Sequence, residues 1–293
     1  MSELPAVAVV GTGRMGAAMA GRMAAAGIGL VLYNRTADRA REVAATTRAA
    51  VAGTAREAAA AADVVLVSLA DDAAVLAAYR GPDGLVAGLR PDTIVADTST
   101  VDPATVGALQ PLVAERGATL LDTPVSGNPS VVESGDLAVM AGGDAAALER
   151  VRPVLGTFAR RVFHLGDSGT GAAMKLAVNS LLHGLNQALA EALVLAERAG
   201  IAPASAYDVF VDSAVAAPFV KYKRAAYEDP ASAPVSFSLD LAAKDLDLIL
   251  ALAGRVQARV PQATANREVL AEALTAGLGD RDLSALALLL SRD

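Results

Sequence analysis

The chain has 293 residues, of which 54% are hydrophobic and 19% charged, a balance that predicts a globular protein with room for two domains. A net charge of −7 argues against nonspecific nucleic-acid binding, while the absence of cysteine and a total of two histidines argue against disulfides and a metal site. The sequence contains no apolar run that would predict a membrane span, and residues 1–5 do not begin a signal segment. We therefore expect a cytoplasmic protein.

The first part of the chain alternates short β-branched runs with alanine-rich stretches of helical length. Strands are predicted at Ala6–Val10, Leu30–Tyr33, Val64–Ser68, Thr93–Ala96, Thr119–Leu121, Leu137–Met140 and Val162–Leu165. Helices are predicted between them at Met15–Ala26, Ala37–Thr46, Pro103–Arg116 and Ala145–Phe158. This alternation is typical of βαβ units and predicts an α/β fold, a doubly wound, mostly parallel Rossmann sheet.

The alternation stops after Gly166, and the rest of the chain has helical patterns only. The first, Gly169–Ala199, is long and apolar nearly all round, as expected of a helix buried between two bodies. Further helices are predicted at Ala204–Asp212, Leu239–Ala253, Pro261–Ala276 and Leu283–Leu290. We therefore expect a dinucleotide-binding domain over residues 1–165 and an all-α domain for substrate binding and oligomerisation over residues 166–293.

A glycine motif follows the first strand and opens the first helix. Its residues are Gly11, Thr12, Gly13, Arg14, Met15 and Gly16, which fit G-x-G-x-x-G. Glycines permit the tight turn and let the backbone approach a pyrophosphate, while the helix N-terminus supplies N–H donors. A lone match would be weak because glycine also serves in ordinary turns, but this one lies at the first turn of a βαβ series. The motif predicts dinucleotide binding.

The end of the second strand indicates which dinucleotide is preferred. An NAD site has Asp or Glu there to bond the ribose 2′-hydroxyl, whereas this chain has Asn34, Arg35 and Thr36. Arg35 can pair with a 2′-phosphate and Thr36 adds a hydroxyl donor, which favours NADP(H) over NAD(H). The alternative is that Arg35 is a solvated surface charge and that Thr36 caps the next helix.

Two more strand ends are expected to border the cofactor, because ligands lie beyond the carboxyl ends of parallel strands. They are Ser68-Leu69-Ala70 and Asp97-Thr98-Ser99-Thr100, with Leu69, Ala70 and Thr100 as the predicted contacts. The alternative for Asp97 and Ser99 is that they satisfy backbone groups of the turn.

The sequence resembles the β-hydroxyacid dehydrogenase family, which includes 3-hydroxyisobutyrate dehydrogenases, tartronate semialdehyde reductases and glyoxylate/succinic semialdehyde reductases. The likeness is carried by GTGRMG at 11–16, DTSTVDP at 97–103, DTPVSG at 122–127, GTGAAMKLAVN at 169–179 and the short block Lys244-Asp245-Leu246. These blocks occur in the family's order and cover most of the chain. The resemblance implies an NAD(P)-dependent oxidoreductase that acts on CH–OH groups.

The resemblance identifies Lys175 with the family's catalytic lysine and Asn179 with its substrate-orienting asparagine. A spacing of four residues puts both side chains on one face of a helix. A lysine in an apolar helix is costly to bury, and burial near a second cation such as Lys244 would suit it to proton transfer near neutral pH. In the family, the lysine corresponding to Lys244 also lies near the nicotinamide. The alternative for Lys175 is a surface lysine with its stem along the helix.

By the same resemblance, Ser126 and Gly127 match the loop that binds the substrate carboxylate, with Asn128 as a further candidate. A hydroxyl with loop N–H groups suits an anion. The family usually has a second glycine next and a small residue a few positions later, where this chain has Asn128-Pro129 and Val132. This departure could narrow the pocket or add an amide donor.

The two histidines have weaker signals. His183 continues the spacing of Lys175 and Asn179 by four residues and could line the pocket, although a satisfied core histidine is the commoner case. His164 at a strand end is interpreted as structural.

These residues predict hydride transfer on a small 3-hydroxyacid or its semialdehyde, with Lys175 exchanging the hydroxyl proton and Asn179 orienting the substrate. Reduction of a small aldehyde such as glyoxylate or succinic semialdehyde is the expected direction. We expect a small carboxylate substrate, no nucleic-acid partner, and a homodimer or homotetramer.

Three alternatives remain. A 6-phosphogluconate dehydrogenase-like decarboxylase has His-Asn where this chain has Val178-Asn179, and an imine reductase typically has Asp or Tyr in place of Lys175. A catalytically silent cofactor sensor is disfavoured because Lys175, Asn179 and Lys244 are all present.

Overall fold

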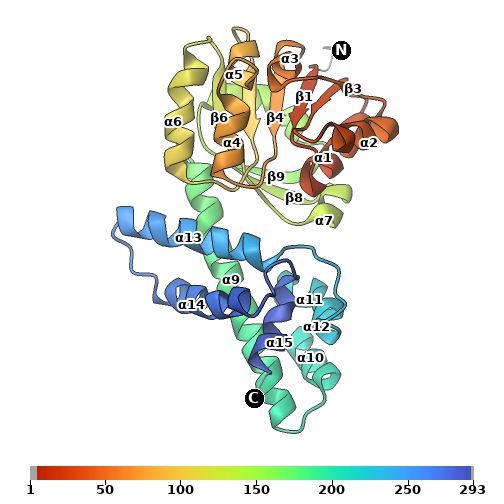
Figure 1. The fold of residues 1–293 in the computed structure, drawn as a ribbon, viewed down its shortest axis with the longest axis vertical. Helices are drawn as coiled ribbons and strands as arrows, with labels where there is room; N and C mark the ends of the chain where they lie inside the picture. The colour runs from red at the N-terminus through yellow and green to blue at the C-terminus, as the bar shows by residue number, and fades with distance from the viewer. Residues whose placement is uncertain (1–4, 292–293) are drawn as a thin grey trace. The chain divides into compact units, whose positions relative to one another are not determined.

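The computed structural model describes residues 5–291 and divides into two compact units, the first ending at Lys175 and the second beginning at Leu176. The helix α9 (Thr170–Arg198) runs across this division as one continuous helix (Figure 1). The domain boundary expected near residue 165 therefore stays a prediction.

The first unit is built on a six-stranded sheet in which all neighbouring strands run parallel. The strands are Val7–Val10 (β1), Leu30–Tyr33 (β2), Ala50–Val51 (β3), Val64–Val67 (β4), Ile94–Asp97 (β5) and Thr119–Asp122 (β6). Their order is β3-β2-β1-β4-β5-β6, so the chain reverses its direction of growth between β1 and β4. Ligands of doubly wound sheets bind beyond the strand ends at such a reversal. The expected Rossmann sheet is confirmed.

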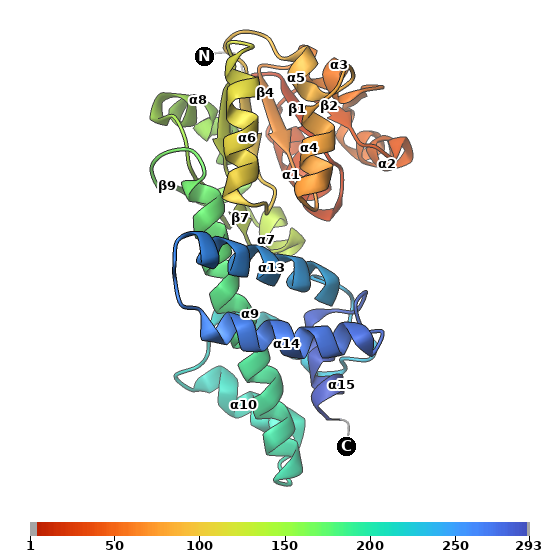
Figure 2. The ribbon, with the colours of Figure 1, turned by 60° about the vertical axis from the view of Figure 1, so that its left-hand side comes forward.

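Helices cover both faces of this sheet, because side chains alternate along each strand. Val7 and Val9 belong to one core cluster, whereas Ala8 and Val10 belong to another. The first cluster is completed by α1 (Arg14–Ala25), α2 (Ala37–Thr47) and α8 (Ala145–Leu155). The second is completed by α3 (Ala55–Ala60), α4 (Asp72–Tyr79), α5 (Leu85–Gly88) and α6 (Pro103–Ala114), which lie together on one face in Figure 2.

A second, three-stranded sheet follows in the same unit. It consists of β7 (Val125–Ser126), β8 (Leu137–Ala141) and β9 (Ala159–His164), with β7 antiparallel and β9 parallel to β8. The strands predicted around 137–140 and 162–165 thus exist but form a sheet of their own. The strands β3 and β7 were not predicted, because two residues are too few for a periodic pattern.

The second unit is helical throughout its described residues, as expected. After α9 come α10 (Pro203–Asp212), α11 (Pro218–Tyr222), α12 (Arg224–Glu228), α13 (Leu239–Arg255), α14 (Pro261–Thr275), the 3₁₀ turn η1 (Leu283–Ala285) and α15 (Leu286–Leu290). A single predicted helix over 283–290 is therefore a 3₁₀ turn followed by a short α-helix. No helix among residues 5–291 is long and apolar enough to cross a membrane.

The long helix α9 is not buried on all sides within a single chain. Leu176, Leu189 and Leu193 are buried, but Leu181 and Leu195 are 77% and 73% exposed. Because 14 residues make nearly four helical turns, these two exposed leucines lie near one face of α9.

Candidate functional site

The glycine turn between β1 and α1 is fixed by close backbone packing. Gly11 has a φ of +99°, and a Cβ on it would overlap the carbonyl oxygen of Ser68. A Cβ on Gly16 would overlap the carbonyl oxygen of Gly11, so the first turn of α1 lies directly against the loop. Both positions therefore require glycine.

The same turn leaves room and donors for an anion. A Cβ on Gly13 would meet no atom within 4 Å, and Gly13, as the N-cap of α1, makes no side-chain cap bond to the helix. Thr12 is buried, and its Oγ1 has no hydrogen-bond partner among the described residues. Open space, a glycine at the N-cap and an unsatisfied hydroxyl at a helix N-terminus fit the pyrophosphate of a dinucleotide.

The other two residues of the motif point elsewhere. Met15 packs against the core beneath the sheet. Arg14 is exposed and lines a surface groove of about 480 Å³, together with residues of α1 and of α7 (Pro129–Glu133).

Asn34 at the end of β2 anchors the glycine turn. Its Oδ1 accepts the Thr12 N–H at 3.0 Å, and its Nδ2 donates to the Thr36 carbonyl at 3.0 Å. The Asn34 amide thus ties the glycine turn to the backbone that follows β2. Arg35 and Thr36 are exposed beside it, Arg35 forms no ion pair within residues 5–291, and the Thr36 hydroxyl makes no capping bond to α2. A cation and a hydroxyl therefore stand at this strand end.

The strand ends of β4 and β5 are bonded to each other. The Leu69 N–H donates to Ser99 Oγ at 3.0 Å, and the Ser99 N–H donates to Asp97 Oδ1 at 2.9 Å. Tyr79 donates its hydroxyl to Asp97 Oδ2 at 2.8 Å, and burial raises the pKa of Asp97. Asp97 and Ser99 thus satisfy turn groups, as the alternative interpretation holds. Ala70 is exposed and Thr100 half-buried at the same edge.

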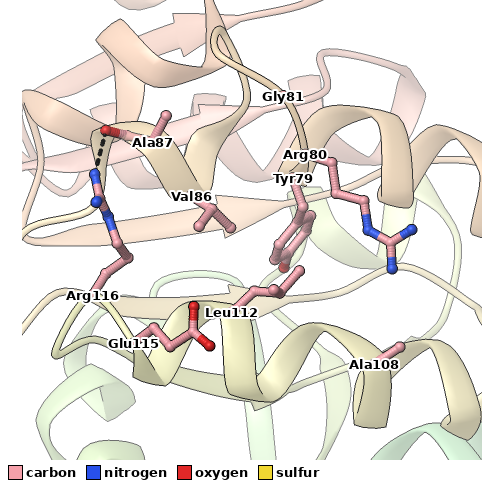
Figure 3. Close-up of a pocket in the computed structure, with 9 residues that line it drawn as sticks. All are labelled: Tyr79, Arg80, Gly81, Val86, Ala87, Ala108, Leu112, Glu115 and Arg116. Carbon is pink, nitrogen blue, oxygen red and sulfur yellow. Dashed lines mark hydrogen bonds between the residues drawn. The ribbon is translucent and has the colours of Figure 1, made fainter.

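A groove of about 560 Å³ lies between α4, α5 and α6 (Figure 3). It is lined by Tyr79, Arg80, Gly81, Val86, Ala87, Ala108, Leu112, Glu115 and Arg116. None of these residues is predicted to bind cofactor or substrate, and Arg116 is held by the Ala87 carbonyl at 2.8 Å. The groove is thus separate from the candidate site.

Ser126 lies in β7 rather than in a loop, and Gly127 follows it with a φ of +141°. A Cβ on Gly127 would lie 2.5 Å from Leu137 Cδ2, so this position also requires glycine. Asn128 is the N-cap of α7, with its Oδ1 accepting the Val131 N–H at 3.2 Å.

The Asn128 oxygen also accepts the Ser130 hydroxyl at 2.6 Å, whereas its Nδ2 makes no hydrogen bond within residues 5–291. The residue that replaces the family's second glycine therefore starts a helix and keeps its donor available.

Lys175 is half-buried in the second turn of α9, and Asn179 follows on the same helix as a buried residue. In the second unit, the Asn179 Nδ2 donates to Asp245 Oδ2 at 2.5 Å. Lys244 lies 2.9 Å from Asp245 Oδ1, and His183 Nε2 lies 3.9 Å from Asp245 Oδ2.

Asp245 therefore organises three of the polar residues that the sequence singled out. Burial alone would raise its pKa, but the neighbouring His183 and the Lys244 ammonium outweigh burial and hold the pKa below its ordinary value. Sequence reasoning gave Asp245 no role, although its position next to Lys244 in a family block was an available signal. His183 is buried and stacks on Phe237, yet its Nε2 has no hydrogen-bond partner among the described residues.

His164 is exposed at the end of β9, with a ring nitrogen 2.8 Å from the Gly143 carbonyl oxygen. No group of His, Asp and Glu side chains within residues 5–291 could hold a metal ion.

Two family models cover most of the chain. One, described as the NAD binding domain of 6-phosphogluconate dehydrogenase, matches residues 6–166. The other, described as the NAD-binding of NADP-dependent 3-hydroxyisobutyrate dehydrogenase, matches residues 169–290. The two matches together span both units.

Known proteins match over nearly the whole length. The chain is 30% identical over 281 residues to 2-(hydroxymethyl)glutarate dehydrogenase of Eubacterium barkeri, covering 96% of this chain and 93% of that protein. It is 31% identical to the chloroplastic glyoxylate/succinic semialdehyde reductase 2 of Arabidopsis thaliana, covering 97% and 79%. A structure of Mycobacterium tuberculosis 3-hydroxyisobutyrate dehydrogenase with L-serine superposes with a TM-score of 0.87 at 31% identity, covering 99% and 100%.

Proposed function

Because the chain belongs to the β-hydroxyacid dehydrogenase family and is thus an oxidoreductase acting on hydroxyl groups, we propose that it interconverts a short 3-hydroxyacid and its semialdehyde with NADP(H). The nicotinamide supplies or accepts the hydride. The chain's own residues bind the substrate acid, orient it and move its proton.

The cofactor proposal rests mainly on the turn after β1. The glycine N-cap of α1, the open position at Gly13 and the Thr12 hydroxyl with no partner among the described residues together make an anion site, and this is the observation that carries the proposal. The preference for NADP(H) is supported by the exposed Arg35 and Thr36 and by the absence of an acidic residue at 34–36. The description of the second family model as NADP-dependent is consistent with it.

The substrate proposal assigns each residue one task. Ser126 and the backbone of Gly127 bind the substrate carboxylate, and the free donor of Asn128 adds a neutral hydrogen bond. Lys175 takes the hydroxyl proton during oxidation and returns it to the forming alkoxide during reduction. Asn179, with its amide fixed by Asp245, orients the substrate, and Lys244 binds near the nicotinamide.

Reduction is the proposed direction, with short semialdehydes as substrates. The names of the Eubacterium barkeri and Arabidopsis relatives support a short acid that carries a hydroxyl or aldehyde group. The test is a screen at 340 nm of NADPH against NADH over semialdehydes, 2-oxo acids and 3-hydroxyacids. Turnover of a short semialdehyde with NADPH preferred supports the proposal. Cofactor binding without turnover on any of these acids would contradict it.

We also propose that the chain self-associates as a homodimer or homotetramer. Leu181, Leu195 and Val209 of the second unit are 77%, 73% and 65% exposed in a single chain. Leu181 and Leu195 lie near one face of α9, and Val209 lies on α10; exposed large apolar residues gathered in this way are more typical of a subunit contact than of a solvated surface.

A further inference from the structure

We propose that Asp122 is a positioning residue that anchors the helix of Lys175 to the segment of Ser126. The inference rests on the proposed function, because it takes Lys175 and Ser126 as the groups that act on the substrate. Every contact that carries it lies within the first unit.

The carboxylate of Asp122 receives the first N–H groups of α9. Asp122 lies at the end of β6, where Oδ1 accepts the Gly169 N–H at 2.8 Å and Oδ2 accepts the Ala172 N–H at 2.8 Å. The first N–H groups of a helix have no partner within the helix, and a carboxylate there also complements the helix dipole. Asp122 therefore caps α9 from a strand that is 47 residues away in sequence.

Two glycines make room for this cap. A Cβ on Gly142 would lie 2.7 Å from Asp122 Oδ1, and one on Gly171 would lie 2.9 Å from Asp122 Oδ2. The backbones of Asp122 and Gly142 also bond to each other in both directions, at 3.2 and 2.9 Å. Gly142 and Gly171 thus confine the Asp122 carboxylate on both sides. This fixes the position of the start of α9 relative to the end of β6.

Lys175 is close to the first turn of α9, which Asp122 caps. It lies five residues after Thr170, the first residue of α9, and about 8 Å along the helix axis at 1.5 Å per residue. A shift or a fraying of the first turn would therefore move Lys175 directly, because little more than one helical turn separates the cap from the amine.

The segment that follows Asp122 also carries Ser126 and Gly127, the residues proposed to bind the substrate carboxylate. Ser126 is four residues after Asp122, and β7 is held by its antiparallel pairing of Ser126 with Ala138 of β8. Asp122 thus connects the element that would bind the substrate acid with the element that would move its proton. Catalytic groups lose rate steeply when such a distance is wrong by about 1 Å.

Burying a charged carboxylate as a helix cap costs free energy. A cap whose only task is to end a helix can lie at the surface and avoid this cost. Asp122 is buried, and burial raises its pKa while backbone N–H groups at the start of α9 oppose the rise. Asp144 gives the comparison, since it caps α8 in the same unit through a single bond to the Ala147 N–H at 2.7 Å. Asp144 is exposed and starts no helix with a predicted catalytic residue, so it serves as the control for the loss of a helix cap alone.

The experiment compares Asp122→Asn with Asp144→Asn, using NADPH and the best semialdehyde from the screen. We expect Asp122→Asn to lower kcat at least tenfold, with the KM for NADPH within twofold of the wild type, and Asp144→Asn to leave both within twofold. In a Lys175→Ala background, Asp122→Asn should leave the residual rate within twofold, because it acts through the lysine. A further tenfold loss there, or wild-type kcat in Asp122→Asn, would overturn the inference.

Hydrogen exchange provides a readout that needs no turnover. Asp122→Asn should speed exchange of the amides over residues 172–175, while the amides of α8 keep their wild-type protection; unchanged exchange at 172–175 would also overturn the inference. If Asp122→Asn does not fold, Gly142→Ala serves for the same comparisons, because its methyl would collide with Asp122 Oδ1, the Asp167 carbonyl oxygen and Thr170 Oγ1 where β6 meets the start of α9. Wild-type turnover by Lys175→Ala would refute the proposed function itself, whereas an inactive Lys175→Ala beside a fully active Asp122→Asn would refute only the role of Asp122.

Discussion

The side-chain amide of Asn179 donates to the carboxylate of Asp245 at 2.5 Å, and this bond joins α9 to α13 inside the second unit. The bond fixes which end of the amide is the donor, so that Asn179 Oδ1 faces away from Asp245 as an acceptor. Lys244 and His183 gather around the same carboxylate. The Asp245 carboxylate therefore brings together the polar groups of Asn179, Lys244 and His183, which come from two segments far apart in the sequence.

Asp245→Asn should destabilise the protein by about 2 kcal/mol near pH 7, because the Asn179 amide loses a bond to a charged group and the ion pair between Lys244 and Asp245 is lost. The pKa of Asp245 in the folded protein lies below its ordinary value of 3.8. The stabilisation is therefore fully present above pH 3.8 and is lost as the pH falls through the lower pKa of the folded state. Urea unfolding from pH 7 downward measures the difference between wild type and variant.

That difference should stay constant between pH 7 and the ordinary pKa of Asp245 and shrink only below it. A difference that already shrinks well above the ordinary pKa of Asp245 would contradict this assignment to the Asp245 carboxylate.

Arg35→Ala should raise the KM for NADPH about tenfold to hundredfold and leave the KM for NADH within twofold. The reason is that a guanidinium paired with a 2′-phosphate contributes about 1.5–3 kcal/mol, and NADH has no such phosphate. Steady-state kinetics with both cofactors measure this. Arg150→Ala removes another exposed arginine of the first unit and should change neither KM. Equal losses with NADPH and NADH would reject Arg35 as the phosphate ligand.

Asn128 allows the helix cap and the substrate contact to be separated. Asn128→Asp and Asn128→Ser both keep an oxygen that can accept the Val131 N–H, so both should retain near-wild-type thermal stability. Only the aspartate adds a negative charge beside the bound acid, so its KM for the semialdehyde should rise at least tenfold and that of the serine variant should rise less. Similar KM values for the two variants would place the substrate acid elsewhere.

Leu181→Glu should shift the protein toward monomer in multi-angle light scattering after size exclusion, because a charge would be buried in the proposed subunit contact. Val256→Glu changes another exposed apolar residue, 62% exposed at the end of α13, and should leave the mass unchanged. An unchanged mass for Leu181→Glu would exclude this face of α9 as the interface.

The fold was largely predictable from the sequence because its signals are local. Buried parallel strands such as Val7–Val10 are continuous apolar runs. The spacing of the glycines after this first strand predicts the dinucleotide site. The sequence could not predict that β7, β8 and β9 form a sheet separate from the six-stranded one. The pairing of Ser126 with Ala138 depends on which strands meet in space.

The candidate residues were predictable as types, but their partners were not. Asn34 was expected as a residue that tolerates a phosphate, and the structure shows that it holds the Thr12 N–H. Asp122 lies 47 residues from Gly169 and Asn179 lies 66 residues from Asp245, so no local pattern indicates either bond. Contacts of this kind follow from the topology, which brings strand ends and helix starts together.

In the proposed reaction, the ammonium of Lys175 exchanges the proton of the substrate hydroxyl. Replacing Lys175 with Met keeps an unbranched apolar stem of similar length and removes the amine, so NADPH binding, followed by fluorescence titration, should remain within threefold of wild type. With the same preparation, kcat on the best semialdehyde should fall about 10²- to 10⁴-fold, the usual contribution of a general acid. Turnover within a few fold of wild type, with NADPH binding intact, would contradict the account.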